Sequence, residues 1–432
     1  MYRISNVKSR NDLADLLDIP VGKLTYILYV KEVNNYYKSF EIPKKTGGTR
    51  EINAPHGDLK RLQRRLAEIL QKYHNELIDN GQIKNYVSHA FEQDKSIITN
   101  AKIHRNKRYI LNVDLENFFN SFHFGRVRGF FIKDKHFLLS EEVATIIAQL
   151  TCYNGSLPQG APTSPIITNL ICNILDSKIV KLAKQYRVDY SRYADDLSFS
   201  TNDNRFITNY AKFMDELNEI ITYAGFSINA KKTRLTYKQS RQEVTGLVVN
   251  RKVGVVKEFC KETRAMADSL YRRGNFSINE SDGCINQLEG RFAFINQVDK
   301  YNNKLAKKQI NCRILNSREK QYQRFLFYKY FFFNNKPFIV TEGKTDISYI
   351  KAAIKKNYTD YPNLVRKVDN KFEYQVSFMT RTKRFRYFFN IALDGADSLQ
   401  NIYNHYTGKN GYNNIAELLK KSILLCLQCL LY

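Results

Sequence analysis

The sequence predicts an α+β fold whose antiparallel sheet carries a small group of carboxylates. Two strand-like runs, Val188–Arg192 and Leu197–Ser200, flank Tyr193-Ala194-Asp195-Asp196, so two acids are expected at the tip of a hairpin. A third acid, Asp114, ends the apolar run Tyr109–Val113. Neighbouring carboxylates repel each other, which is poor for stability but suits the binding of divalent metal. Three such acids around two Mg²⁺ ions would form the arrangement used for in-line phosphoryl transfer.

The elements around this hairpin alternate between strand-like and helix-like patterns. Apolar residues recur at three- and four-residue spacing from Leu59 to Leu77, which predicts a helix. Strands interleaved with helices in this way favour an antiparallel sheet covered by helices. The other expected elements are a hairpin over 42–52 turning at Gly47-Gly48, a rigid loop over 158–165, a helix through 170–179 and a helix through 206–221 that stops near Gly225.

Composition restricts the partners of this chain. Its 432 residues carry a formal charge of +26 with 43% hydrophobic residues, so the chain is globular and strongly basic. The charge favours nucleic acid as the partner over an anionic membrane. No secretory signal opens the chain, and its seven cysteines are scattered, which suits a reducing cytoplasm. Cys426-x-x-Cys429 lacks a second ligand pair, and no apolar run reaches the roughly 18 residues of a membrane helix.

Three motifs in order resemble the palm of a reverse transcriptase. They are Asp114 after a strand, the loop Pro158-Gln159-Gly160, and Tyr193-Ala194-Asp195-Asp196. The resemblance runs from about residue 40 to 250, with a thumb continuing to about 320. It implies a right-hand polymerase with fingers, a palm and a helical thumb.

Two shorter motifs resemble those of bacterial retron enzymes. Asn100-Ala101-Lys102-Ile103-His104 matches the Asn-Ala-x-x-His motif, and Val244-Thr245-Gly246 matches the Val-Thr-Gly motif near the end of the polymerase region. By resemblance, Asn100, His104, Val244, Thr245 and Gly246 are expected to contact the cognate RNA. For His104 a structural role stays open beside RNA contact, and no acid or nucleophile accompanies it for catalysis.

The resemblance also implies roles at the polymerase site. Asp114 and Asp195 would bridge two Mg²⁺, or Mn²⁺, with Asp196 assisting. Phe119, five residues after Asp114, would close the space of a ribose 2′-OH, with an ordinary core position as the alternative. Gln159 and Gly160 are expected at the nucleotide and template site. Arg50 is preferred over Lys44 and Lys45 as the cation that binds the triphosphate. Lys232 is preferred over Lys231 as the residue that protonates the leaving pyrophosphate.

The retron resemblance implies partners as well. The template would be a structured noncoding RNA encoded beside the enzyme, and synthesis from dNTPs would start at a 2′-OH of a guanosine in that RNA. The product would be multicopy single-stranded DNA branched from the RNA. Host RNase H would remove the copied template, and the system would defend bacteria against phage. A homo-oligomer stays open.

The last hundred residues resemble the start of a Toprim domain. Val340-Thr341-Glu342-Gly343 lies between a strand beginning at Phe338 and a helix, which makes Glu342 the expected catalytic acid. A second Asp-x-Asp should follow, yet the nearest match, Asp394-Gly395-Ala396-Asp397, has the wrong spacing. The chain then ends in the apolar run Ser422–Tyr432 with nothing to complete the layer. We therefore expect an incomplete Toprim-like domain, truncated or frame-shifted, in which a working nuclease and an inert docking domain are equally compatible with the sequence.

Three other functions stay open. A group II intron-like reverse transcriptase would carry a maturase or endonuclease extension, which is not evident. An RNA-binding antitoxin scaffold would not need the three acids, and a template-independent polymerase also fits.

The expected domains are a helical cap over 1–40, fingers and palm over 41–257, a thumb over 258–333 and the Toprim-like part over 336–432.

Overall fold

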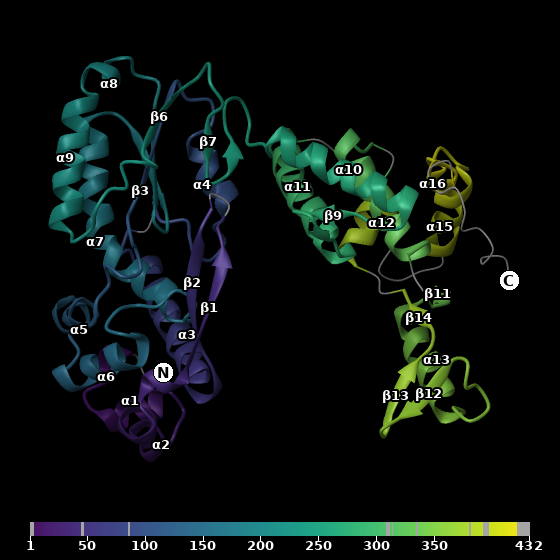
Figure 1. Ribbon diagram of the computed structural model, residues 1–432, viewed down its shortest axis with the longest axis horizontal. Helices are drawn as coiled ribbons and strands as arrows, with labels where there is room; N and C mark the ends of the chain where they lie inside the picture. The colour runs from purple at the N-terminus through teal and green to yellow at the C-terminus, as the bar shows by residue number, and fades with distance from the viewer. Residues whose placement is uncertain are drawn as a thin grey trace. The chain divides into compact units, whose positions relative to one another are not determined.

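A computed structural model describes residues 4–44, 47–84, 87–307, 312, 314–333, 336–379, 382–391 and 397–420. The chain divides into two units, residues 1–253 and 254–432, and each has its own hydrophobic core. Within the described parts, no helix combines the length and the apolar character that crossing a membrane requires. Figure 1 shows the elements of both units.

The first unit contains the predicted hairpin, sheet and helices. Its helices are α1 (Arg10–Leu16), α2 (Val21–Thr25), α3 (Gly57–Asp79), α4 (Ile97–Ile103), α5 (Phe124–Lys133), α6 (Glu141–Thr151), α7 (Ser164–Gln185), α8 (Arg205–Thr208) and α9 (Tyr210–Tyr223). Its strands are β1 (Tyr37–Pro43), β2 (Thr49–Pro55), β3 (Tyr109–Asp114), β4 (Asp189–Tyr193), β5 (Asp196–Thr201), β6 (Arg234–Tyr237), β7 (Glu243–Val244) and β8 (Leu247–Val248). A π-helix covers Tyr26–Val30, and 3₁₀ turns cover Ile4–Asn6 and Val33–Tyr36.

The central sheet has the strand order β4-β5-β3-β6, and every neighbouring pair is antiparallel. Because side chains alternate across a strand, Tyr190 and Arg192 of β4 face α7, whereas Ser191 faces α4. The sheet therefore lies between helices on both faces, and its antiparallel pairing agrees with the predicted α+β fold. Two short hairpins, β1–β2 and β7–β8, pair separately from it.

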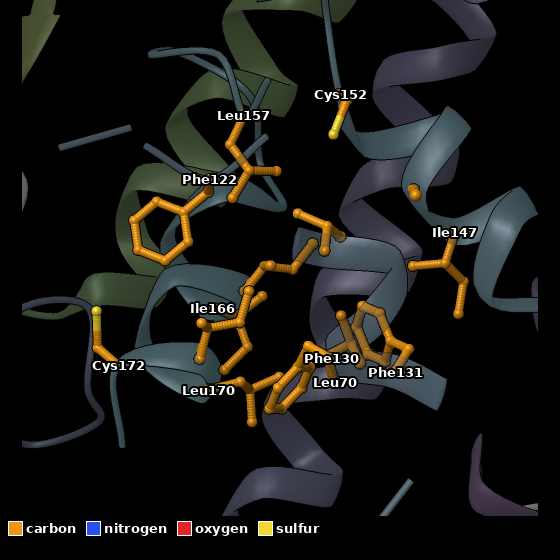
Figure 2. Close-up of a cluster of buried hydrophobic side chains, with 14 of the residues drawn as sticks. Leu70, Phe122, Phe130, Phe131, Ile147, Cys152, Leu157, Ile166, Leu170 and Cys172 are labelled. Atoms are coloured by element: carbon orange, nitrogen blue, oxygen red, sulfur yellow. The ribbon is translucent and has the colours of Figure 1, made fainter. Parts of the chain in front are cut away.

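The core of the first unit lies among the long helices. In Figure 2, Leu70 of α3, Phe130 and Phe131 of α5 and Ile147 of α6 surround the start of α7 around Ile166. These side chains are almost entirely buried, which accounts for the three- and four-residue spacing of apolar positions in α3. The first forty residues contribute to the same core through Leu13, Leu24 and Ile27, so the expected helical cap packs as part of this unit.

The second unit combines a helical part with small sheets. Its helices are α10 (Lys257–Arg273), α11 (Ile285–Leu305), α12 (Ser317–Phe331), α13 (Lys344–Lys356), α14 (Lys383–Phe389), α15 (Asp397–Thr407) and α16 (Ile415–Lys420). Its strands are β9 (Ser277–Ile278), β10 (Ser281–Asp282), β11 (Phe338–Ile339), β12 (Val365–Val368), β13 (Lys371–Tyr374) and β14 (Ser377–Phe378). β11 and β14 pair in parallel, with α13 between them along the chain.

The expected thumb and Toprim-like segments share one core. Tyr322 of α12 packs edge-on against Phe388 of α14, with ring centroids 5.0 Å apart, and Gln323 donates a hydrogen bond to the Phe388 carbonyl at 2.6 Å. Phe325 and Phe389 join the same cluster. The boundary drawn near residue 334 therefore separates segments of sequence that pack as one body.

Candidate active site

The three expected carboxylates come together at one end of the central sheet. The register of β3 and β5 places Asp114 directly opposite Asp196. Asp195 lies in the short turn between β4 and β5, where Ala194 has a left-handed backbone with φ of 56°. The Asp195 carbonyl accepts a hydrogen bond from the Leu115 amide at 3.0 Å, which ties the turn to the end of β3. We call Asp114, Asp195 and Asp196 the carboxylate cluster.

The surroundings of Asp195 and Asp196 disfavour the ionised state of these two acids. Asp196 reaches solvent but lies against a concave wall of protein, and desolvation, together with the charges of Asp195 and Asp114, raises its pKa to about 7. Desolvation also raises the pKa of Asp195, and Asp114 adds to this, whereas Lys232 and Arg50 oppose it. Groups that resist ionisation in this way gain most from a bound cation, and their hard oxygen atoms match the ligand preference of Mg²⁺.

Lys232 forms an ion pair with the first of these acids. Its Nζ donates to both oxygens of the Asp114 carboxylate, at 2.9 and 3.0 Å, and these bonds raise the pKa of Lys232. In the described parts of the chain, no three acidic, histidine or cysteine side chains are gathered as a formed ion site. Metal binding at Asp114 therefore requires the ammonium group to move, and the 60% exposure of the Lys232 side chain leaves it room to do so.

A cavity of about 1080 Å³ lies on the fingers side of the cluster. Asp114, Asp195 and Lys232 line it, together with Arg50 of β2 and Gln159 of the loop before α7. The predicted nucleotide residues Arg50 and Gln159 thus face the same space as the carboxylates. Lys44 also lines this cavity, whereas Lys45 lies outside the described residues.

Gly160 allows the Gln159 loop to approach the fingers hairpin closely. Its φ is 114°, and a Cβ at this position would lie 2.8 Å from Cγ2 of Ile52 and 3.1 Å from the Asn53 carbonyl oxygen. The Asn53 amide donates a hydrogen bond to the Gln159 carbonyl at 2.8 Å. A side chain at residue 160 would separate the two walls of the cavity, so glycine is required here.

Phe118 and Phe119, which follow Asp114, differ in their contact with the larger cavity. Phe118 is buried and contributes to the lining of the larger cavity. Phe119 is half-buried, packs edge-on against Phe118 and is not among the described residues that line this cavity. The expected role of Phe119 as the 2′-OH gate stays a prediction, with Phe118 as the residue to compare.

A second cavity, of about 440 Å³, adjoins the other side of the cluster. It is lined by Asp114 and Asp196, by the cations Lys231, Lys232 and Arg234, and by Thr245 and Gly246. Thr245 and Gly246 form the turn of the β7–β8 hairpin with φ of 48° and 76°, whereas Val244 is buried beneath it. The Val-Thr-Gly motif therefore faces the catalytic end of the sheet.

The Asn-Ala-x-x-His motif lies inside the protein. The Asn100 and His104 side chains have no exposed surface. Ser191 donates to Asn100 Oδ1 at 2.5 Å, so His104 Nε2 must donate to Ser191 Oγ at 2.7 Å, and His104 Nδ1 accepts from Ser200 Oγ at 2.8 Å. Desolvation lowers the pKa of His104 to about 3, which keeps the ring neutral. This buried histidine network (Asn100, His104, Ser191 and Ser200) links α4 to β4 and β5, which favours the structural role of His104 over RNA contact.

The opposite face of β4 carries an ion pair that the sequence patterns did not reveal. Arg192 is fully buried, and its guanidinium donates to both oxygens of Asp176 on α7, at 2.8–3.1 Å. It also donates to Asn169 at 3.2 Å and to the carbonyl of Ala194 at 3.4 Å. Arg192 thereby supports the turn that carries Asp195. An arginine between two tyrosines of a strand, with an aspartate on the preceding helix, was the available signal.

The expected Toprim acid, Glu342, belongs to the second unit. Glu342 is exposed and follows β11, and the Gly343 amide donates to Asp346 at 2.7 Å at the start of α13. The candidate partner acid Asp394 lies outside the described residues, as does the apolar end of the chain. Glu342 is thus placed after a strand and before a helix, as its motif predicted.

Comparison with known proteins identifies the relatives of this chain. Residues 42–249 match the family described as reverse transcriptase (RNA-dependent DNA polymerase). The chain is 34% identical over 294 residues to the retron Ec86 reverse transcriptase of Escherichia coli, covering 67% of this chain and 84% of that protein. It is 31% identical over 329 residues to the retron Mx162 reverse transcriptase of Myxococcus xanthus, covering 68% of this chain and just under two thirds (65%) of that protein. Among solved structures, telomerase from Candida albicans aligns with 69% of this chain and 61% of its own, at 12% identity and a TM-score of 0.38.

Proposed function

Because this chain belongs to the retron-type reverse transcriptases, which are RNA-directed DNA polymerases, we propose that it copies a structured noncoding RNA encoded beside it into DNA. Synthesis starts from a 2′-OH of that RNA, and the product is a branched RNA–DNA molecule. The observation that carries this proposal is the β3–β5 register, which sets Asp114 opposite Asp196 with Asp195 in the adjoining turn. The identity to retron enzymes and the two retron-type motifs support the choice of template.

In this proposal the carboxylate cluster holds two Mg²⁺, or Mn²⁺, through Asp114, Asp195 and Asp196. When bound, the metal supplies charge that lowers the pKa of the priming hydroxyl and stabilises the leaving pyrophosphate. Lys232 lies close enough to Asp114 to protonate that pyrophosphate once its ion pair opens, and Lys231 is the alternative from the neighbouring cavity.

The two cavities divide the substrates between them. The dNTP occupies the larger cavity, where Arg50 meets its triphosphate and Gln159 contacts the base pair. The RNA nucleotide that carries the priming hydroxyl occupies the smaller cavity, beside Arg234, Thr245 and Gly246. This division is favoured because Asp114 lines both cavities, so reacting groups from either side meet at the same carboxylate.

The wider system extends the proposal beyond the polymerase site. In this proposal host RNase H removes the copied template, as the resemblance to retron enzymes implies. The branched product then serves in defence against phage. In the second unit, the parallel β11–β14 pair with α13 between them supports a Toprim-like fold with Glu342 as its acid. We propose no nuclease activity for it, because the candidate partner acid Asp394 lies outside the residues that the structure describes.

Purification from cells that carry the surrounding genes tests this function. Nucleic acid bound to the wild type and to the Asp195→Asn/Asp196→Asn variant would be treated with RNase or DNase and then sequenced. A short DNA branched from a structured RNA, present only with the wild type, is the expected result. RNA without DNA in both samples would favour the antitoxin scaffold, and DNA joined to no RNA would favour template-independent synthesis or an intron-like enzyme.

A further inference from the structure

We infer that the end of the central sheet opposite the carboxylate cluster binds the phosphate backbone of a base-paired RNA segment that is not being copied. The inference rests on the proposed function, because it assigns a second contact to the same RNA partner. It concerns a surface made by loops of the first unit only. Of the two retron-type motifs this surface includes only the exposed Lys102. Asn100 and His104 lie in the interior, and Thr245 and Gly246 line a cavity at the end of the sheet that carries the carboxylate cluster.

The strand directions define this surface. Tyr109, the first residue of β3, pairs with Thr201 at the end of β5 and with Tyr237 at the end of β6. Asp189, the first residue of β4, pairs with Ser200, so β4 begins at the same end. Five steps of about 3.3 Å along β3 separate this end from Asp114, a distance of about 17 Å. In Figure 1 this end carries α8, far from the β1–β2 hairpin.

Exposed cations from several loops meet at this end. Asn106 donates its amide to the Val249 carbonyl at 2.9 Å, and Asn250 donates to the Lys238 carbonyl at 3.0 Å, so the loops before β3, after β6 and after β8 are joined. The Arg187 carbonyl accepts from Thr201 at 2.9 Å, which adds the loop before β4. We define the distal basic surface as the exposed residues Lys102, Arg105, Arg108, Arg187, Lys238, Arg251 and Lys252.

The acids nearby do not neutralise these cations. Within the described parts of the chain, none of the seven forms an ion pair with a carboxylate. The neighbouring acids are paired with other cations: Asp189 with Lys107, Asp203 with Arg205 and Glu243 with Arg241. Among the described residues, the end of the sheet opposite the carboxylate cluster therefore carries seven cations that form no ion pair with a carboxylate.

The arrangement fits a folded RNA better than a single strand. A single strand is held in a groove with aromatic rings for its bases, whereas the most exposed ring here, Tyr237, packs edge-on against Tyr109 at 5.5 Å. Cations spread over a broad end instead match the phosphates of an A-form helix, which proteins contact through backbone and shape. Asn106 and Arg187 hold left-handed backbones, with φ of 56° and 55°, so both loops have defined conformations before any partner binds.

The test uses the full chain and an RNA hairpin of about 16 base pairs as the probe. The variant carries Lys102→Gln, Arg105→Gln, Lys238→Gln and Arg251→Gln. Its matched control carries Lys133→Gln, Lys135→Gln, Lys181→Gln and Lys184→Gln, which removes the same charge from exposed positions on or beside α5 and α7. Hairpin affinity is measured across a salt series, and DNA synthesis is measured on a poly(rA)·oligo(dT) template that has no folded segment.

We expect the variant to bind the hairpin at least about tenfold more weakly than the control, with the slope of log affinity against log salt smaller by about three to four. Synthesis on the homopolymer should stay within about twofold of wild type. Equal loss of binding in both variants would overturn the site, as would unchanged binding in the variant of the distal basic surface. Loss of homopolymer synthesis in the variant would show that the surface serves the active site, and preference for anionic vesicles over the hairpin would assign it to membranes. Because binding and synthesis are read separately, an inactive wild type that still binds the hairpin would count against the proposed function alone.

Discussion

The carboxylate cluster and the buried histidine network lie on the same strands and are built in opposite ways. The cluster is open to solvent, carries like charges and has raised pKa values at Asp195 and Asp196. The network is closed, neutral and nearly saturated with hydrogen bonds around His104. Repulsion among the acids of the cluster lowers stability, whereas the hydrogen bonds of the network stabilise β4 and β5 a few residues away. A conspicuous polar motif can therefore mark either chemistry or support, and burial separates the two.

The largest expected effect comes from removing charge at the cluster. Asp195→Asn with Asp196→Asn should lower DNA synthesis by at least about a thousandfold, because the acids act together in the reaction. Without metal the same change should raise thermal stability, since it removes repulsion. Primer extension and thermal melting in EDTA measure both effects. Full-length DNA from the variant would disprove the metal assignment.

A substitution in the buried histidine network should lower the stability of the protein instead of raising it. His104→Ala should lower the free energy of unfolding by about 2–4 kcal/mol, because it leaves a cavity and strands the hydroxyls of Ser191 and Ser200. Urea denaturation measures the loss. RNA affinity of the folded fraction should be unchanged. A stable variant with weakened RNA binding would return His104 to the group of RNA-contacting residues.

The pH dependence of stability should separate the two sites again. The pKa of Asp196 is about 7 in the folded protein against an ordinary value of 3.8, so the folded state keeps a proton that the unfolded chain releases. This group's contribution to stability therefore falls as the pH rises from about 4 to about 7. Melting in EDTA should show Asp196→Asn close to wild type at pH 4 and more stable above pH 7. A constant difference across that range would contradict the raised pKa.

The lowered pKa of His104 predicts the reverse dependence of stability on pH. Its pKa is about 3 when folded against an ordinary value of 6.5, so unfolding takes up a proton between these values. Its contribution to stability is complete above pH 6.5 and is lost as the pH falls toward 3. His104→Gln, which keeps a donor and an acceptor, should flatten that part of the wild-type profile. An unchanged profile would mean that another group controls acid unfolding.

The smallest expected effect comes from substitutions of Phe119 and Phe118. Phe119→Ala should raise the relative efficiency of ribonucleotide over deoxynucleotide incorporation, whereas Phe118→Ala should mainly reduce stability because Phe118 is buried. The ratio of kcat/KM for matched nucleotides measures the first effect, and melting measures the second. Relaxed selectivity only in the Phe118 variant would identify Phe118 as the gate.

Much of the site follows from local sequence rules. Asp114 after an apolar strand and Asp195-Asp196 between two others require only strand periodicity and a tight turn, and antiparallel pairing then brings the strand ends together. The sequence could not reveal the supporting contacts, because the partners of His104 are 87 and 96 residues away. Arg192 was missed for a related reason, since a charged residue in a strand is expected at the surface unless its partner on another element is known.

Domain limits were also beyond local patterns. The first forty residues have helical signals of their own, yet their apolar side chains complete the core of the first unit. The segments on either side of residue 334 likewise share aromatic contacts that no composition change indicates. Which faces meet depends on packing between distant elements, and a linear pattern does not contain that information.

The close approach at Gly160 has a consequence for protein engineering. Because a main-chain hydrogen bond joins Asn53 to Gln159, and no side chain fits between the two segments at residue 160, the fingers hairpin and this loop form one structural unit. Libraries designed to alter processivity or nucleotide choice should exchange residues 49–55 together with 158–162. Grafting either segment alone from a relative would misalign the nucleotide pocket, even if each donor sequence were fully active in its own enzyme.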